Sequence, residues 1–139
     1  MTIKLLVIDD DTAVTDLLSL LLKSQGFEVS ATNNSSEGLS MIRDIEPDLV
    51  ILDLMMPEMD GWEVCRAVRQ FNQQVPIIIL SALNDPSMIA SVLDAGADDY
   101  LTKPTPSRVL VAHINRLTKR SGNTRSSLRD SFTRPLPAS

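Results

Sequence analysis

The sequence predicts an α/β fold in which five parallel strands form an open, doubly wound sheet with helices on both faces. Three observations lead to this prediction. Short apolar runs recur along the chain, segments with helical periodicity lie between them, and polar residues follow directly after several of the runs. Buried parallel strands form near-continuous apolar runs, whereas amphipathic helices place an apolar residue every three or four positions. Their alternation favours right-handed crossovers between parallel neighbours.

Five apolar runs are the candidate strands: Ile3–Ile8, Phe27–Ala31, Leu49–Leu52, Pro76–Leu80 and Tyr100–Leu101. The first, third and fourth consist almost entirely of Ile, Leu and Val, as expected for strands that are covered on both faces. The second strand ends in Thr32-Asn33, without a reactive side chain, and therefore fits outside the first strand. We expect the sheet order 2-1-3-4-5, with five helices between and after the strands.

Periodicity and capping residues predict the first two helices. The first carries an apolar stripe of Val14, Leu17, Leu18, Leu21 and Leu22. Asp11 is expected to cap its start, and Gly26 lies where a left-handed C-terminal cap belongs. The second helix opens with Asn34-Ser-Ser-Glu37, close to a capping box, and ends before Pro47. Its inward residues are expected to be Leu39, Ile42 and Ile45.

Three further helices follow. The third runs from about Trp62 to Phe71, with Trp62 as a half-buried anchor. The fourth opens at Asp85-Pro86, a cap followed by proline at the first helical position, and ends before Gly96. Thr105-Pro106 repeats that opening for a fifth helix. The residues expected to be buried on the third and fifth helices are Val64, Cys65, Val68, Leu110, Ile114 and Leu117.

Composition limits the class of protein. A chain of 139 residues with 43% hydrophobic residues suits one compact domain, and a net charge of −5 argues against a nucleic-acid clamp. The periodicity stops at Ser121, so we expect the folded unit to span residues 1–120 and residues 121–139 to form a flexible linker or C-terminal tail. The lone Cys65 and the lack of a bilayer-length apolar run fit a cytoplasmic protein that does not enter the membrane.

Polar residues mark one site in this fold. Asp9 and Asp10 end the first strand, Asp53 ends the third, Ser81 ends the fourth and Lys103 lies just past the fifth. Ligands of doubly wound sheets bind outside the carboxyl ends of the strands. Single acidic residues at strand ends often only cap helices, but one cap needs one residue, so capping alone accounts poorly for Asp9 and Asp10.

Three converging carboxylates repel one another and favour a hard cation such as Mg²⁺, which needs only one or two carboxylates and keeps several waters. Phosphoryl oxygens can then take the open coordination positions. Asp53 can act as a carboxylate nucleophile that forms an acyl phosphate, while Lys103 and the Ser81 hydroxyl hold the remaining oxygens.

Four separated motifs resemble the receiver domains of two-component response regulators. They are Leu5-Leu-Val-Ile-Asp-Asp-Asp11, Leu52-Asp-Leu-Met-Met-Pro-Glu-Met-Asp-Gly61, Ser81-Ala82 and Ala97-Asp-Asp-Tyr-Leu-Thr-Lys-Pro104. Their order and spacing match over residues 3–120. The resemblance implies a flavodoxin-like fold and a phosphorylation switch that assists only its own phosphorylation and dephosphorylation, rather than a conventional enzyme.

The resemblance also implies individual roles. Asp53 is then the phosphoacceptor, Asp10 a direct ligand of Mg²⁺, Asp9 a supporting one, and the Met55 backbone carbonyl a further ligand. Ser81 and Lys103 bind phosphoryl oxygens, and the Lys103–Pro104 bond is expected to be cis. Tyr100 is the aromatic switch residue coupled to Ser81. The implied partners are a sensor histidine kinase or phosphotransfer protein, and an output domain, another protein or a second copy of the chain.

Three other functions remain as alternatives. A phosphohydrolase with an aspartyl-phosphate intermediate needs a second Asp two residues after Asp53, and Met55 stands there. A flavin or nucleotide carrier needs a Gly-rich loop after the first strand, where the chain has acid. A pseudo-receiver that only binds partners predicts the loss of site residues, and none is missing.

Two local departures bear on regulation. Met55 and Leu83 flank the acyl phosphate in the family, where polar residues help to place attacking water, so their apolar character predicts slow self-dephosphorylation over minutes or longer. Thr105-Pro106-Ser107-Arg108 lacks an acidic residue that such receivers often use in inter-subunit ion pairs, which argues against dimerisation through that face. His113, which has no partner ligand nearby in sequence, is expected to be structural.

Overall fold

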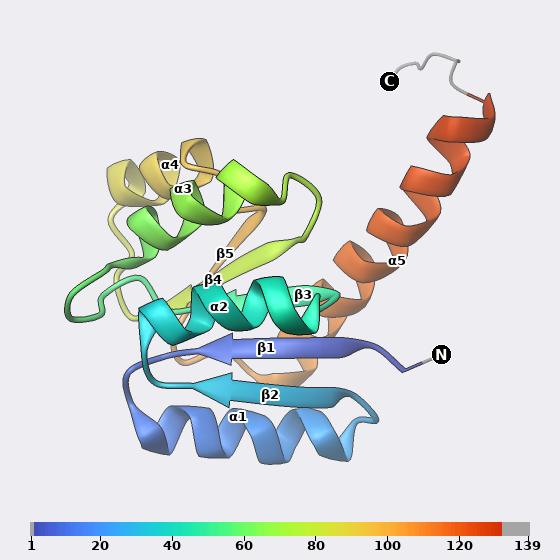
Figure 1. Ribbon diagram of the computed structural model, residues 1–139. Coiled ribbons are helices and arrows are strands. Elements are labelled where there is room, and N and C mark those ends of the chain that lie inside the picture. The colour runs from blue at the N-terminus through green and yellow to red at the C-terminus, as the bar shows by residue number, and fades with distance from the viewer. Residues whose placement is uncertain (1, 132–139) are drawn as a thin grey trace.

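A five-stranded parallel sheet lies between two layers of helices in the computed structural model, which describes residues 2–131 and the side chains of residues 2–119 (Figure 1). The strand order is β2-β1-β3-β4-β5. The reversal of winding therefore falls between β1 and β3. The predicted fold class and strand order are both confirmed.

The strands are β1 (Lys4–Ile8), β2 (Glu28–Thr32), β3 (Leu49–Leu52), β4 (Ile77–Ser81) and β5 (Asp99–Thr102). The helices are α1 (Thr12–Ser24), α2 (Ser35–Ile45), α3 (Gly61–Phe71), α4 (Pro86–Asp94) and α5 (Ser107–Ser131). Each strand is followed by a helix, so every pair of neighbouring strands is parallel.

Successive residues of the central strands supply two separate cores, because side chains alternate between the faces of a sheet. On β1, Leu6 and Ile8 belong to the cluster that packs against α2, α3 and α4. Leu5 and Val7 belong to the cluster that packs against α1 and α5. Both faces of β1, β3 and β4 are therefore dry, and polar groups can be placed only at the strand ends.

The helix caps agree with the sequence. The Asp11 carboxylate accepts a hydrogen bond from the Ala13 amide at 2.9 Å, and Gly26 has a φ of 97°, which favours glycine. Asp85 caps α4 with Pro86 at its first position. The structure adds a complete capping box at α3, in which the side chains of Asp60 and Glu63 each accept a bond from the other's backbone amide.

One predicted core residue of α1 is wrong. Leu17 is 56% exposed, whereas Leu18 and Leu22 are buried and Thr15 completes the inward face. Thr15 is buried and its hydroxyl accepts a hydrogen bond from the Asn33 side chain at 3.1 Å. Residues two positions apart lie on nearly opposite sides of a helix, so Leu17 faces solvent when Thr15 faces inward. The other predicted inward residues, on α2, α3 and α5, are buried or half-buried.

The start of α5 differs from the prediction. The helix begins at Ser107, and the Pro106 carbonyl accepts the first amides, those of Val109 and Leu110. The Thr105 hydroxyl donates instead to the Thr102 carbonyl at 2.6 Å, so Thr105 does not cap the helix. Helical backbone continues past residue 120 to Ser131, and the sequence has no proline between Pro106 and Pro135. The boundary of the folded unit stays a prediction, and residues 132–139 lie outside the described part.

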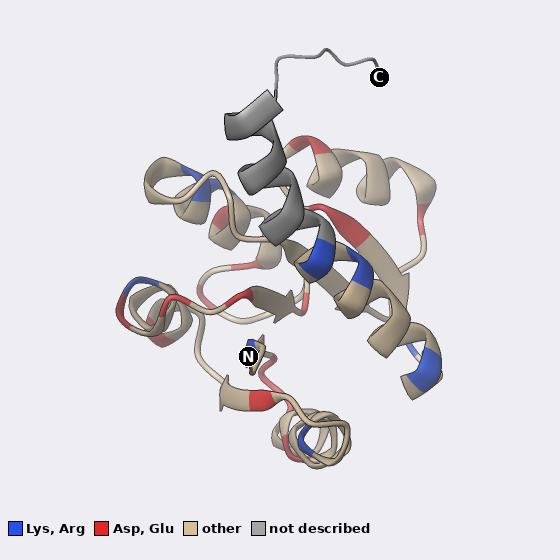
Figure 2. Ribbon diagram, turned by 90° about the vertical axis from the view of Figure 1, so that its right-hand side faces the viewer, with Lys and Arg blue, Asp and Glu red and all other residues tan. Residues whose placement is uncertain are grey.

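A charge cluster joins α5 to β5. Asp99 accepts hydrogen bonds from Arg116 at 2.8 Å and from His113 at 2.5 Å. Arg116 is one of three basic residues between Ser107 and Lys119, with Arg108 and Lys119. Figure 2 shows basic positions on this coloured part of α5. His113 therefore has the structural role that the sequence predicted, and its partner is on β5.

Cys65 is a buried free thiol, and burial raises its pKa to about 11, so it behaves as the small hydrophobe that the sequence predicted. None of the described helices combines the length and the apolar character that are needed to cross a bilayer.

Arg69 joins the amino-terminal ends of β4 and β5. From the last turn of α3, its guanidinium donates to the carbonyls of Gly96, Asn72 and Val75 at 2.8–3.1 Å and to the Asp98 carboxylate at 3.0 Å. The same carboxylate oxygen accepts the Ile77 amide at 2.8 Å. One side chain thus satisfies backbone groups of three turns that would otherwise be half-buried without partners.

We predict that Arg69→Ala lowers the free energy of unfolding by about 2 to 4 kcal/mol, because it leaves several half-buried carbonyls without donors and removes one of the two hydrogen bonds to the Asp98 carboxylate. Urea unfolding of the two proteins measures the difference. Arg66→Ala, which removes an exposed arginine one turn earlier on α3, is the matched control and should change stability by less than about 0.5 kcal/mol. Equal effects of the two substitutions would contradict the assignment.

Candidate functional site

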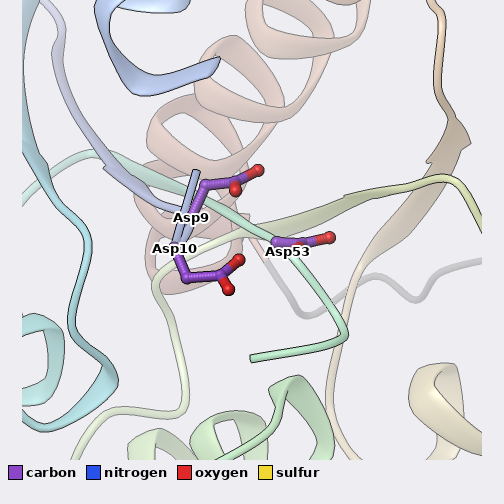
Figure 3. A group of neighbouring side chains, drawn as sticks. All are labelled: Asp9, Asp10 and Asp53. Atoms are coloured by element: carbon purple, nitrogen blue, oxygen red, sulfur yellow. The ribbon is translucent and has the colours of Figure 1, made fainter. Parts of the chain in front are cut away.

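Three carboxylates converge at the carboxyl edge of the sheet. Asp9 and Asp10 directly follow β1, and Asp53 directly follows β3, its neighbour in the sheet (Figure 3). One carboxylate oxygen of each residue lies within 4.8 Å of the other two. Asp9 and Asp53 are 3% and 9% exposed, whereas Asp10 is open to solvent. The sequence predicted this convergence.

Backbone pairing fixes the positions of the two buried carboxylates. The Asp53 amide donates to the Ile8 carbonyl at 2.9 Å, which extends the ladder between β1 and β3 by one residue. The Asp9 amide donates to the Thr32 carbonyl at 3.2 Å in the same way. The Asp9 carboxylate also accepts the Asp11 amide at 2.9 Å. The pairing of the strands, rather than the conformation of a loop, therefore determines where Asp9 and Asp53 lie.

Lys103 reaches into the same site from the end of β5. Its Nζ lies 2.8 Å from Asp9 Oδ2 and 3.8 Å from Asp53 Oδ1. The Lys103 amide donates to the Ser81 carbonyl at 2.8 Å, and the following bond to Pro104 is cis, as predicted. One ammonium group thus lies against two of the three carboxylates.

The charges at the site are not balanced. Burial and the neighbouring charge of Asp9 raise the pKa of Asp53 to about 6, and the attraction of Lys103 only partly opposes this. Burial lowers the pKa of Lys103, but the hydrogen bond that Lys103 donates to Asp9 and the negative charges of Asp53 and Asp9 outweigh this effect, so the net direction of the pKa is upward. A deprotonated Asp53 is therefore costly in the absence of a cation.

The donor set fits a hard divalent cation. Asp9, Asp10 and Asp53 offer carboxylate oxygens close enough to share one ion, and oxygen donors are those that Mg²⁺ prefers. Asp11 is committed to capping α1. Met55, whose carbonyl is the further predicted ligand, lies on the loop after β3 with its side chain 54% exposed. The identity of the ligands and of the ion stays a prediction.

Ser81 and Tyr100 lie on the adjacent strands and share one contact. The Ser81 side chain, at the end of β4, is 1% exposed, and its hydroxyl accepts the Leu83 amide at 3.3 Å. Tyr100 packs half-buried against the core, and its hydroxyl donates to the Leu83 carbonyl at 2.5 Å. Ser81 and Tyr100, which the sequence predicted to be coupled, therefore both hydrogen-bond Leu83: Ser81 through the Leu83 amide and Tyr100 through the Leu83 carbonyl.

The loop between β3 and α3 closes tightly behind Asp53. The Gly61 amide donates to the Leu54 carbonyl at 2.8 Å, and a Cβ on Gly61 would lie 2.9 Å from the Asp53 carbonyl oxygen. No real Cβ approaches a backbone oxygen so closely, so this position requires glycine. Gly61 therefore brings the start of α3 directly against the backbone of Asp53.

Sequence reasoning missed two contacts at this site, both from the turn after β2. The Asn33 side-chain amide donates to the Asp9 carbonyl at 2.8 Å, and the Ser35 hydroxyl donates to the Met59 carbonyl at 2.7 Å. Both acceptors are backbone carbonyls, which every residue type provides, so the sequence does not identify them. The sequence does show two side-chain donors, Asn33 and Ser35, just after the one strand that supplies no reactive group to the site.

The arrangement agrees with what is known of similar proteins. The sequence model of the response regulator receiver domain family matches residues 5–115. The transcriptional regulatory protein AfsQ1 of Streptomyces coelicolor is 44% identical over 116 residues, and the DNA-binding response regulator MtrA of Mycolicibacterium smegmatis is 38% identical over 118. These matches cover 84% and 85% of this chain but 51% of each relative. The chain therefore spans about half the length of these relatives.

Solved structures support the same relation. A CheY-like receiver domain protein of Methanospirillum hungatei has a TM-score of 0.85 at 27% identity, with 89% of this chain and 99% of that chain covered. The BeF₃-activated receiver domain of Klebsiella pneumoniae RstA has a TM-score of 0.80 at 32% identity, over 84% and 98% of the two chains. With its fold, its acidic edge and these matches, the chain belongs to the response regulator receiver domain family of two-component systems.

Proposed function

We propose that the chain accepts a phosphoryl group on Asp53 from a sensor histidine kinase or a phosphotransfer protein, in the cytoplasm. The observation that carries the proposal is the position of Asp53, a buried carboxylate held between the acid of Asp9 and the ammonium of Lys103. A nucleophile needs access for an incoming group and charge compensation for its product, and this edge of the sheet offers both.

The protein contributes to this reaction mainly by positioning the groups and by stabilising charge, with Asp53 as the one residue that forms a covalent bond. An oxygen of the Asp53 carboxylate attacks the phosphorus of a phosphohistidine, the P–N bond breaks, and the imidazole leaves with its electron pair. Lys103 Nζ neutralises charge on the phosphoryl oxygens, and the Ser81 hydroxyl, at the end of the neighbouring strand β4, is the hydrogen-bond donor. Later attack of water on phosphorus releases inorganic phosphate and restores the carboxylate.

A Mg²⁺ ion at Asp9, Asp10, Asp53 and the Met55 carbonyl would offset the negative charge that nucleophile and phosphoryl group bring together. The raised pKa of Asp53 supports this part of the proposal, because a cation favours the ionised carboxylate that attacks phosphorus. In this arrangement the protein orients Asp53 and excludes bulk water from its buried side.

Leu83 connects the phosphoryl site to the outer surface in this proposal. Phosphorylation draws the Ser81 hydroxyl toward the new oxygens and away from the Leu83 amide. Leu83 also bonds Tyr100, so a shift of this segment biases the side chain of Tyr100 and the surface of α4, β5 and α5. Such a switch is a change of population between two states, driven by the preference of the phosphate for one of them.

The changed surface acts on an output domain or another protein. AfsQ1 and MtrA, whose names describe transcriptional and DNA-binding regulators, are about twice as long as the part that matches this chain. Control of transcription is thus the output that the relatives favour, and it would be exerted through a partner or a further domain. A pseudo-receiver that binds partners without phosphorylation is the alternative.

The first prediction from the proposed function concerns the phosphoacceptor, Asp53. Incubation with Mg²⁺ and acetyl phosphate should add one phosphoryl group to the protein, visible by intact mass. The modification should require Mg²⁺, because the metal offsets the charge of the carboxylates. Asp53→Asn keeps the shape of the side chain, removes the nucleophile and serves as the control.

A folded wild-type protein that binds Mg²⁺ and takes up no phosphoryl group would sink the proposal and favour the pseudo-receiver. A modification that persists in Asp53→Asn would place the acceptor on another residue.

The second prediction concerns the lifetime of the acyl phosphate. Met55 and Leu83 carry no group that could orient an attacking water, so the purified phosphoprotein should lose its phosphate over minutes or longer. Met55→Asn should shorten the half-life several-fold, since its amide can hydrogen-bond water beside Asp53. Loss within seconds from the wild-type protein, measured by intact mass after removal of the donor, would contradict this expectation.

The third prediction concerns stability. In Mg²⁺-free buffer at pH 7, Asp53→Asn should raise the free energy of unfolding by about 1 to 2 kcal/mol, because it removes a buried, repelled charge. The pKa of Asp53 is raised in the fold from 3.8 to about 6, so the gain should be complete above pH 6 and vanish below about pH 4. Urea unfolding across this range measures it.

Mg²⁺ should reduce the difference in the free energy of unfolding between wild type and Asp53→Asn, because the ion stabilises the wild-type fold more than the variant that lacks one carboxylate. A pH-independent gain would instead indicate an effect of packing.

A further inference from the structure

The turn between β2 and α2 contacts both segments that carry the acidic site. Asn33 Nδ2 donates to the Asp9 carbonyl, which lies between β1 and α1, at 2.8 Å. Ser35 Oγ donates to the Met59 carbonyl, which lies between β3 and α3, at 2.7 Å. β2 supplies no carboxylate to the site, yet its turn bridges the two segments that do.

Ser35 is a buried residue with a fixed hydrogen-bond partner. It is the first residue of α2, is 5% exposed, and its hydroxyl lies 3.6 Å from the Met56 sulfur as well as 2.7 Å from the Met59 oxygen. A buried hydroxyl without an acceptor costs free energy, so the bond to Met59 is maintained in the native state. The contact therefore acts as a fixed tether between α2 and the loop.

The loop that Ser35 holds carries Met55. The Met55 carbonyl belongs to the peptide group shared with Met56, whose side chain is 9% exposed within the core. Glu58, two residues on, has a φ of 70°, a conformation that a residue with a side chain adopts reluctantly. Among residues 2–119, no side chain outside the loop other than Ser35 hydrogen-bonds residues 55–59.

We infer that Ser35 is a positioning residue for the divalent cation, because it holds the loop that presents the Met55 carbonyl at a fixed distance from Asp53. The inference rests on the proposed function, in which that carbonyl is a metal ligand. Ser35 does not touch the ion. Its effect reaches the site through Met56 and Met59, as outer contacts of metal sites orient the inner ligands.

Asn33 has the matching role on the other side of the site. Its amide holds the Asp9 carbonyl and also donates to Thr15 Oγ1 at 3.1 Å, which anchors the turn to α1. The two residues hold different segments of the site, and neither hydrogen-bonds the carbonyl that the other holds.

The test compares Ser35→Ala with Ser36→Ala by calorimetric titration of the unphosphorylated proteins with Mg²⁺. Ser36 is exposed and is the next residue of the same helix, so the control makes the same chemical change one position away. Loss of one buried tether should weaken Mg²⁺ binding by about three- to tenfold in Ser35→Ala. The control should stay within about twofold of wild type.

Phosphorylation by acetyl phosphate at varied Mg²⁺ separates positioning from damage to the fold. In Ser35→Ala the Mg²⁺ concentration that gives half the maximal rate should rise by the same factor as the dissociation constant, while the maximal rate stays within about twofold. A merely structural role would lower the folded fraction and hence the maximal rate, and would leave the half-saturating concentration unchanged.

Unchanged Mg²⁺ affinity in Ser35→Ala, or an equal loss in Ser36→Ala, overturns the inference. If Ser35→Ala does not fold, Ser35→Cys keeps the volume, replaces the hydroxyl by a weak donor, and should weaken binding in the same direction. A wild-type protein that binds Mg²⁺ but accepts no phosphoryl group refutes the proposed acceptor alone, since the affinity comparison still decides the role of Ser35. Failure of the wild type to bind Mg²⁺ refutes both.

Discussion

The meeting of three carboxylates at one edge of a dry sheet is the constraint on which the rest of the molecule depends. Asp9 and Asp53 are placed by strand register, so they cannot separate to relieve their repulsion without breaking the ladder between β1 and β3. The fold itself provides one compensating charge, Lys103, for two buried carboxylates. Burial of these carboxylates therefore costs stability at the point where the proposed function needs them, and the proposed Mg²⁺ would offset that cost.

Hydrogen bonds around the site hold its segments in place despite the repulsion between the carboxylates. Every segment that carries a site residue is tied to a neighbour by a bond that does not involve the carboxylates: Asn33 to Asp9, Ser35 to Met59, Gly61 to Leu54 and Lys103 to Ser81. These bonds use backbone carbonyls and keep the loops in place while the charges on them vary. Leu83 is the exception, because both of its backbone groups bond side chains expected to move.

The sequence was sufficient for the fold and for the acidic residues. Asp9, Asp10 and Asp53 could be predicted because parallel strands end at one edge, and residues that follow adjacent strands must meet there. The contacts of Ser35, Asn33 and Arg69 could not, since their acceptors are backbone carbonyls, which every residue type provides. The exposure of Leu17 was also beyond prediction, because the rotation of a surface helix is decided by tertiary packing and not by its own periodicity.

The contacts of Arg69 hold the amino-terminal ends of β4 and β5 together. Its guanidinium secures the segments before β4 and β5, which lie at the opposite ends of these strands from Ser81 and Lys103. No carboxylate of the acidic site takes part in these contacts, so a change of charge at the site does not remove them. The two strands therefore keep a common starting point whatever charge their carboxyl ends have to accommodate.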